Sequence, residues 1–147
     1  SLYKSTDSGV KIYGKLLKTE NQIRIEQTTI SQIHKNFSLD SIDILKLDLQ
    51  GGELNALRGA KELLSTSKIK TIICEVMFQN IYDQKSTWLD IFSFLQEYNF
   101  DLFNFYQFNF HNGKALQADC IFIQNDFYKS LNINNNSFQL NSKLILP

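Results

Sequence analysis

Proline and glycine are scarce in this sequence. The only proline is Pro147, and the six glycines form no Gly-x-Gly pair. A glycine-rich turn is the usual cradle for a nucleotide. The missing pair therefore excludes the usual nucleotide-binding loop from these 147 residues.

The sequence has only two cysteines, Cys74 and Cys120. They stand in the apolar runs TIICEVM and DCIFI, and neither belongs to a CxxC or CxxH pair. This pattern excludes a zinc module and a scaffold built on disulfides. We expect each cysteine to be a small buried hydrophobe.

An excess of charge and long apolar runs are also missing. The 15 basic and 15 acidic side chains balance, which argues against a nucleic-acid partner. No window approaches the roughly 18 apolar residues of a membrane span, and residues 1–15 contain no stretch typical of a signal peptide. With 43% hydrophobic and 20% charged residues, we expect one folded, soluble, cytoplasmic domain over residues 1–147, with no membrane partner.

The first part of the chain has weak structural signals. Residues 1–20 are polar and contain several lysines, so we expect a loop of low order there. Residues 22–26 (QIRIE) alternate between apolar and polar side chains, which predicts a half-buried edge strand. A short helix is expected from a cap at Thr28 or Thr29 to Asn36.

Two units of strand and helix follow. Near-continuous apolar character predicts buried strands over residues 42–49 and 71–77. Apolar residues at helical spacing predict helices over residues 53–64 and about 86–98. A tight turn at Gly51-Gly52 joins the first strand to its helix.

The C-terminal part predicts a hairpin. Residues 101–110 form an aromatic-rich strand, Asn112-Gly113 is a typical hairpin turn, and residues 118–125 form a last strand. Residues 126–147 are expected to be a loose tail. The whole pattern predicts an α/β sandwich with a mostly parallel sheet and an antiparallel C-terminal hairpin.

Polar residues follow both predicted central strands. Ligands of such sheets bind at the carboxyl ends of the strands. We therefore expect these residues to face one crevice: Asp48, Gln50, Gly51, Gly52 and Glu53 after the first strand, and Glu75, Met77 and Gln79 at the end of the second.

Asp48 and Glu75 are the residues in that set most suited to chemistry. Asp48 either caps the following helix or contacts a ligand or metal. Glu75 stands in an apolar run, where a carboxylate is costly unless it has a partner, which is either a ligand or one of Lys46 and Lys70. If the two carboxylates are close together, one should titrate abnormally, as in a metal site or a general base. Glu53 is either a site residue or a complement to the helix dipole.

The stretch IDILKLDLQGGELNALRGAKELL, residues 42–64, resembles the hallmark of the FkbM family of S-adenosylmethionine-dependent methyltransferases. Gly52 replaces a residue that is usually larger in that family. Three further motifs of the family occur in the family's order: Glu75-Val76, Ile81-Tyr82-Asp83, and Leu116-Gln117-Ala118-Asp119. The resemblance extends to about residue 125. Matching positions in the hallmark are Ile42, Asp43, Leu45, Lys46, Asp48, Gln50, Gly51, Glu53, Leu54, Leu57, Gly59 and Ala60.

The resemblance implies the C-terminal portion of a Rossmann-like class I methyltransferase domain, with the fourth to seventh strands. The glycine-rich cofactor loop of the family would lie upstream of residue 1. The implied reaction is methyl transfer to a hydroxyl of a sugar or secondary metabolite. We expect this chain to be inactive alone. A homo-oligomer in which another copy completes the site remains an alternative.

The resemblance also implies roles for individual residues. Asp48 and Glu75 are the expected catalytic residues, and Asp48, Gln50, Gly51 and Glu53 are expected to bind S-adenosylmethionine. If a divalent metal binds, Asp48 and Glu75 would be its ligands.

Two other functions remain as alternatives. The first is a non-catalytic interaction or assembly module, which the missing cofactor loop favours. The second is a metal-dependent nuclease, but Met77 stands where such enzymes usually have a lysine.

Overall fold

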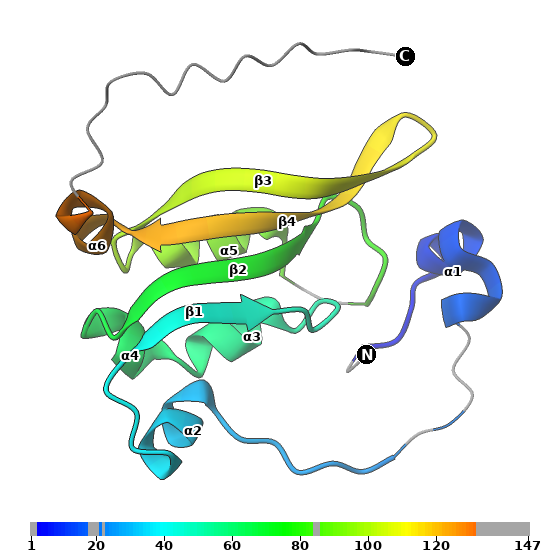
Figure 1. Cartoon of the computed structure of the whole chain (residues 1–147). Helices are drawn as coiled ribbons and strands as arrows, with labels where there is room; N and C mark the ends of the chain where they lie inside the picture. Colours follow the sequence, from blue (N-terminus) through cyan, green and yellow to red (C-terminus); the bar gives the residue numbers. More distant parts are fainter. Residues whose placement is uncertain (1–2, 18–20, 22, 84–85, 132–147) are drawn as a thin grey trace, which may run out of the picture.

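The computed structural model describes residues 3–17, 21, 23–83 and 86–131 (Figure 1). Its centre is one four-stranded sheet with the strand order β1-β2-β4-β3. The elements in chain order are α1 (Asp7–Tyr13), a 3-10 turn (Gly14–Leu17), α2 (Ile30–Asn36), β1 (Ile42–Leu47), α3 (Glu53–Arg58), α4 (Lys61–Ser65), β2 (Ile69–Met77), α5 (Trp88–Gln96), β3 (Phe100–His111), β4 (Lys114–Gln124) and α6 (Asn125–Ser130).

The sheet is mostly antiparallel. Strands β1 and β2 are parallel, whereas β4 runs antiparallel to both of its neighbours, β2 and β3. The α/β class and the C-terminal hairpin are confirmed, but the predicted mostly parallel sheet is wrong. The helix α5 leads into β3 at the sheet edge, and the hairpin then returns β4 into the place beside β2. Strand patterns in the sequence do not reveal which strand becomes the neighbour.

Local signals explain the hairpin turn. Asn112 and Gly113 have φ angles of 49° and 73°. Two positive φ angles in succession match the two-residue turn whose twist suits antiparallel strands, and asparagine and glycine tolerate them best.

Helices α3, α4 and α5 pack against the sheet around one hydrophobic core, and Figure 1 shows α3 and α5 behind it. The helix predicted over residues 53–64 is two helices, which separate at Gly59 and Ala60. A Cβ at Gly59 would lie only 3.3 Å from Cβ of Thr29, so the missing side chain at Gly59 lets Thr29 approach closely. Helix α5 begins with a capping box between Thr87 and Asp90. Fully buried core residues include Leu57, Leu64, Ile69, Ile72, Leu95, Phe100 and Phe122.

The predicted loop over residues 1–20 is wrong at residues 7–17, because they form α1 and the 3-10 turn. This helix docks on the segment after β2. The backbone N–H of Thr6 donates to the Ile81 carbonyl at 2.9 Å, and the Thr6 hydroxyl donates to the Asn80 carbonyl at 2.6 Å. A helix of this length is marginal in isolation, so contacts with distant residues stabilise it and its own sequence does not reveal it.

Two other predictions for the chain ends and edges are corrected. Residues 23–26 form no strand, and Ile23 is 83% exposed, because no neighbouring strand pairs with this segment. Residue 22 and residues 132–147 lie outside the described residues. The predicted loose tail is wrong at its start, since α6 covers Asn125–Ser130. Helix α2 and its Thr29 cap are confirmed.

The cysteines are buried and free, as predicted, and they face each other across β2 and β4. None of the helices in the described ranges combines the length and apolar composition that a membrane crossing requires.

Candidate functional site

The turn after β1 is shaped by Glu53. Its side chain is 3% exposed, and its carboxylate accepts hydrogen bonds from the backbone N–H of Leu49 at 2.7 Å and of Gly51 at 2.9 Å. Gln50 and Gly51 have positive φ angles of 51° and 103°. The hydrogen bonds to the Glu53 carboxylate stabilise this turn conformation. Burial raises the pKa of Glu53, and these backbone hydrogen bonds oppose the shift.

Asp48 lies at the start of this turn with an exposed side chain. The N-cap residue of α3 is Gly52, and no side chain caps the helix there. The interpretation of Asp48 as a helix cap is therefore wrong. Its charge instead raises the pKa of Glu75.

Glu75 lies on β2 opposite Asp119 of β4. Its Oε1 accepts a hydrogen bond from Nε2 of Gln117 at 2.7 Å. Its Oε2 is shielded from solvent and has no hydrogen-bond partner within the described part of the chain. Burial is the main cause that raises the pKa of Glu75 to about 7, followed by the negative charges of Asp48, Glu53 and Asp119.

The sequence left Lys46 and Lys70 as structural partners for Glu75. Lys70 pairs with Asp43 instead. Lys46 forms no ion pair with Glu75 among the residues described, although its charge lowers the pKa of Glu75 slightly against the other influences. Within the described ranges, Glu75 thus has no cationic partner at contact distance, as expected of a site residue.

A cleft of about 260 Å³ adjoins Glu75, and we call it the Glu75 cleft. Three of the residues predicted to share one crevice line it, namely Gln50, Glu75 and Met77. Asp48, Gly51, Gly52, Glu53 and Gln79 are not among its lining residues. The full lining is Tyr13, Leu16, Leu17, Gln50, Glu75, Met77, Ile81, Tyr82 and Gln117.

Helix α1 and the following turn form one wall of the cleft. Figure 1 shows α1 beyond the arrowhead of β1, at the carboxyl end of the parallel strands. The Tyr13 hydroxyl donates to Oε1 of Gln117 at 2.9 Å, so α1 is linked to Glu75 through one amide. Burial and the charge of Glu75 raise the pKa of Tyr13. Tyr13 therefore remains a protonated donor at neutral pH.

Sequence reasoning missed Tyr13, Tyr82 and Gln117 as site residues. Tyr13 lies in a segment predicted to be a loop, and only the distant docking of α1 places it in the site. Tyr82 and Gln117 belong to motifs of the family resemblance, so that signal was present although their position in the cleft was not visible.

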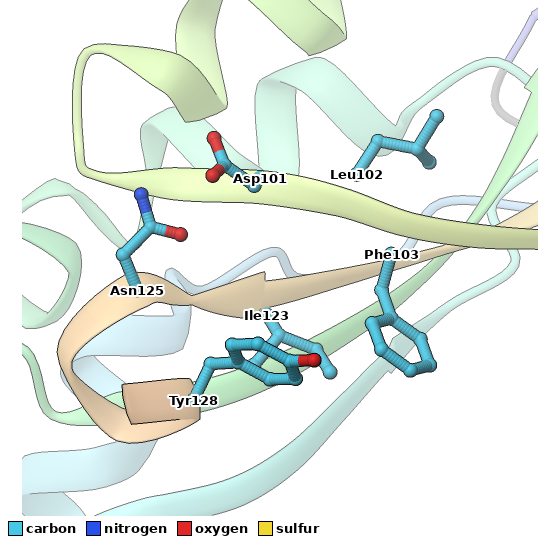
Figure 2. Close-up of a pocket in the computed structure, with 6 residues that line it drawn as sticks. All are labelled: Asp101, Leu102, Phe103, Ile123, Asn125 and Tyr128. Carbon is cyan, nitrogen blue, oxygen red and sulfur yellow. The ribbon is translucent and has the colours of Figure 1, made fainter. Parts of the chain in front are cut away.

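A second cavity lies far along β4 from Gln117, between β3, β4 and α6. Its volume is about 230 Å³, and it shares no residue with the Glu75 cleft. Figure 2 shows the side chains of Phe103, Ile123 and Tyr128 close together there, and the rings of Phe103 and Tyr128 are 5.9 Å apart. We assign the candidate site to the Glu75 cleft, because the carboxyl with a pKa of about 7 lies there. The cavity is lined by Asp101, Leu102, Phe103, Ile123, Asn125 and Tyr128.

No group of three or more histidine, cysteine, aspartate or glutamate side chains is arranged to hold a metal ion in the part of the chain that the structure describes. The charge of Asp48 raises the pKa of Glu75, and a metal held by these two carboxylates alone stays a prediction. We assign no metal site.

A comparison with family models identifies the methyltransferase FkbM domain over residues 2–102. The match covers more than half of the chain. The chain belongs to the FkbM methyltransferase family. No match was found among curated proteins or among solved structures. For this FkbM chain, the matched range includes the β1–α3 turn, Glu75 and Tyr82, whereas Gln117 falls outside it.

Proposed function

We propose that this chain takes part in methyl transfer from S-adenosylmethionine to a hydroxyl group, with Glu75 as the base that accepts the hydroxyl proton. The observation that carries the proposal is the Glu75 carboxyl. One oxygen is held by Gln117, the other has no partner among the described residues, and the pKa is about 7. A general base is most effective when its pKa lies near the working pH. Membership of the FkbM family supports methyl transfer in general.

The residues at the Glu75 cleft fit part of the cofactor. When bound, S-adenosylmethionine supplies an electrophilic methyl group on its sulfonium sulfur. Gln50 lines the cleft and Asp48 follows β1 at the same edge, so both would bind hydroxyl or amino groups of the cofactor. Glu53 would act by holding Gly51, because both carboxylate oxygens are bound within the turn.

The cleft encloses a volume that matches only part of the cofactor. Pockets that enclose a drug-sized ligand have volumes of roughly 300 to 1,000 Å³, against about 260 Å³ here. The sequence also has no Gly-x-Gly turn. We therefore expect the chain alone to bind the cofactor weakly and to be inactive in transfer.

The proposed acceptor is an uncharged hydroxyl compound, such as a sugar or a secondary metabolite. Leu16, Leu17, Met77 and Ile81 give the cleft apolar walls, and the described lining includes no lysine or arginine. An anionic acceptor would meet Glu75 without a compensating cation, which is unfavourable at a partly buried site. A neutral hydroxyl can donate its proton to Glu75 and place its apolar part against these walls.

The test is an NMR titration of the chain with the demethylated cofactor, S-adenosylhomocysteine, with and without Mg²⁺. We expect saturable shifts at Gln50, Glu75 and Tyr82, while Phe103 and Tyr128 at the second cavity serve as an internal control. Shifts confined to the second cavity, or no shifts at millimolar ligand, would contradict the assignment. The latter result would favour the non-catalytic module.

A further inference from the structure

We propose that Gln117 and Tyr13 are positioning residues that keep Oε1 of Glu75 as a hydrogen-bond acceptor and so direct the acceptor's proton to Oε2. This inference rests on the proposed function of Glu75 as a base. It assigns a role to two side chains that do not themselves accept the proton, one of which belongs to helix α1.

The direction of the two hydrogen bonds carries the argument. An amide nitrogen can only donate, so Nε2 of Gln117, 2.7 Å from Oε1 of Glu75, requires that oxygen to accept. The Gln117 carbonyl oxygen then faces the Tyr13 hydroxyl, which donates to it at 2.9 Å. If the amide rotated by half a turn, its carbonyl would face the carboxylate. Tyr13 therefore stabilises the orientation in which the amide donates to Glu75.

The direction of the hydrogen bond from Gln117 also distinguishes the two carboxylate oxygens of Glu75. A proton on Oε1 would point at the N–H of Gln117 and break that bond. Oε2 has no partner among the described residues, so it is the oxygen that can take a proton without losing a contact. Because it is shielded from solvent, the side chains that cover it must move aside when the acceptor binds. In the proposed reaction, the acceptor oxygen forms a bond to the methyl carbon and the bond from carbon to sulfur breaks. The electron pair of that bond passes to sulfur, and the hydroxyl proton passes to Oε2.

Helix α1 is held firmly enough to place Tyr13. The backbone N–H of Thr6 and the Thr6 hydroxyl bind carbonyls in the segment after β2, and the N–H of Asp83 donates to the Lys4 carbonyl at 2.8 Å. Gly9 is buried against Ile81 so closely that a Cβ at Gly9 would collide with the Ile81 carbonyl oxygen. These contacts bring Tyr13 to Gln117, which is 104 residues away in the sequence.

The elements packed against Glu75 contribute charged and titratable groups that influence its pKa. Tyr13 and Tyr82 both have a raised pKa, to which the charge of Glu75 contributes, so their hydroxyls stay protonated at neutral pH. The hydrogen bond from Gln117 acts against the carboxylates, because a donor to the charged form favours ionisation. The negative charges of Asp48, Glu53 and Asp119 raise the pKa of Glu75, and the positive charge of Lys46 lowers it.

The test compares the titration midpoint of the Glu75 carboxyl carbon by ¹³C NMR in the full chain and its variants. Gln117→Met keeps the length of the side chain but removes the donor, and we expect the midpoint to rise by roughly one to two pH units. Tyr13→Phe should raise it by a smaller amount in the same direction. Tyr128→Phe, at the second cavity, is the matched control and should leave the midpoint unchanged.

An unchanged midpoint in Gln117→Met, in a chain with a preserved amide spectrum, would overturn the proposal. A shift in Tyr128→Phe as large as that in Tyr13→Phe would also overturn it, because the effect would not depend on the link to Gln117. A failure of the proposed function would give a different result from a failure of this inference. In that case the midpoints move as expected, but S-adenosylhomocysteine does not shift the residues of the Glu75 cleft.

Discussion

Replacing Gly9 by alanine tests the docking of helix α1, on which one wall of the site depends. The new Cβ would collide with the Ile81 carbonyl oxygen and lie 3.2 Å from Cγ2 of the same residue. The carbonyl cannot retreat without cost, because it accepts a hydrogen bond from the backbone N–H of Thr6. Helix α1 must therefore move away from the segment after β2.

Two opposing contributions determine how much free energy of unfolding Gly9→Ala should lose. Overpacking at a tight contact costs about 1 to 3 kcal/mol. Alanine in place of a helical glycine returns about 1 kcal/mol. The free energy of unfolding should fall by up to roughly 2 kcal/mol. If α1 detaches completely, the loss is limited to its docking contacts, which include hydrogen bonds of about 0.5 to 1.5 kcal/mol each.

Urea unfolding gives the stability change, and amide hydrogen exchange of residues 7–13 shows whether α1 is released. Ser8→Ala is the matched control, because Ser8 is the exposed neighbour in the same helix. We expect Gly9→Ala to lose stability and amide protection in α1, and Ser8→Ala to retain both. Equal stability and equal protection in the two variants would refute the close contact between α1 and Ile81.

Three other predictions concern titratable groups. Between its ordinary pKa of 4.5 and the folded value of about 7, Glu75 binds a proton only in the folded chain. Stability due to Glu75 should therefore fall as the pH rises through this range and level off above it. Relative to Glu75→Gln, we expect the wild type to lose roughly 1 to 2 kcal/mol in urea unfolding between pH 4.5 and 8, a figure reduced for partial exposure; parallel curves would contradict this. Asp48→Asn should keep the fold and lower the Glu75 midpoint in ¹³C NMR, because a repelling charge is lost; an unchanged midpoint would place Asp48 outside the site. Burial raises the pKa of Cys74 well above its usual value and that of Cys120 to about 12, so a thiol reagent at pH 8 should label them only after unfolding, and rapid labelling of the native chain would show that they are accessible.

Elements with strong local signals could be predicted from the sequence. Thr29 supplies a side-chain cap to α2, and Asn112-Gly113 supplies the positive φ angles of a tight hairpin. Strand β2 was visible because buried strands are apolar over most of their length. In each of these cases the physical cause acts within a few residues. Strand β1 was predicted from the same signal as a buried central strand, and that burial is wrong, because β1 lies at the edge of the sheet and Ile44 is 63% exposed.

The rest of the fold depends on contacts between distant segments. In the described part of the predicted edge strand, residues 23–26, no strand among the described residues lies alongside, so the alternation did not produce a strand. Helix α1 depends on Asn80 and Ile81, which the pattern of residues 7–13 does not contain. The antiparallel position of β4 beside β2 is a choice among neighbours that strand patterns do not encode.

The candidate site divides in the same way. Glu75 could be predicted because a carboxylate inside an apolar run needs a special environment. Tyr13 and Gln117 could not be placed beside it, because hydrogen bonds across 104 residues leave no local pattern. Glu53 was expected near the cofactor, and its two backbone hydrogen bonds show that its carboxylate shapes the turn. Its contact with the cofactor remains a prediction.

The proposed role of Glu75 requires that its carboxyl take up a proton near neutral pH. The most direct test is the pH titration of the Glu75 carboxyl carbon in the unmodified chain by ¹³C NMR, with the signal assigned from the spectrum of Glu75→Gln. We expect a midpoint near 7. A midpoint near the ordinary value of 4.5 would contradict the proposed role, because Glu75 would then be an ordinary carboxylate, ionised throughout the neutral range.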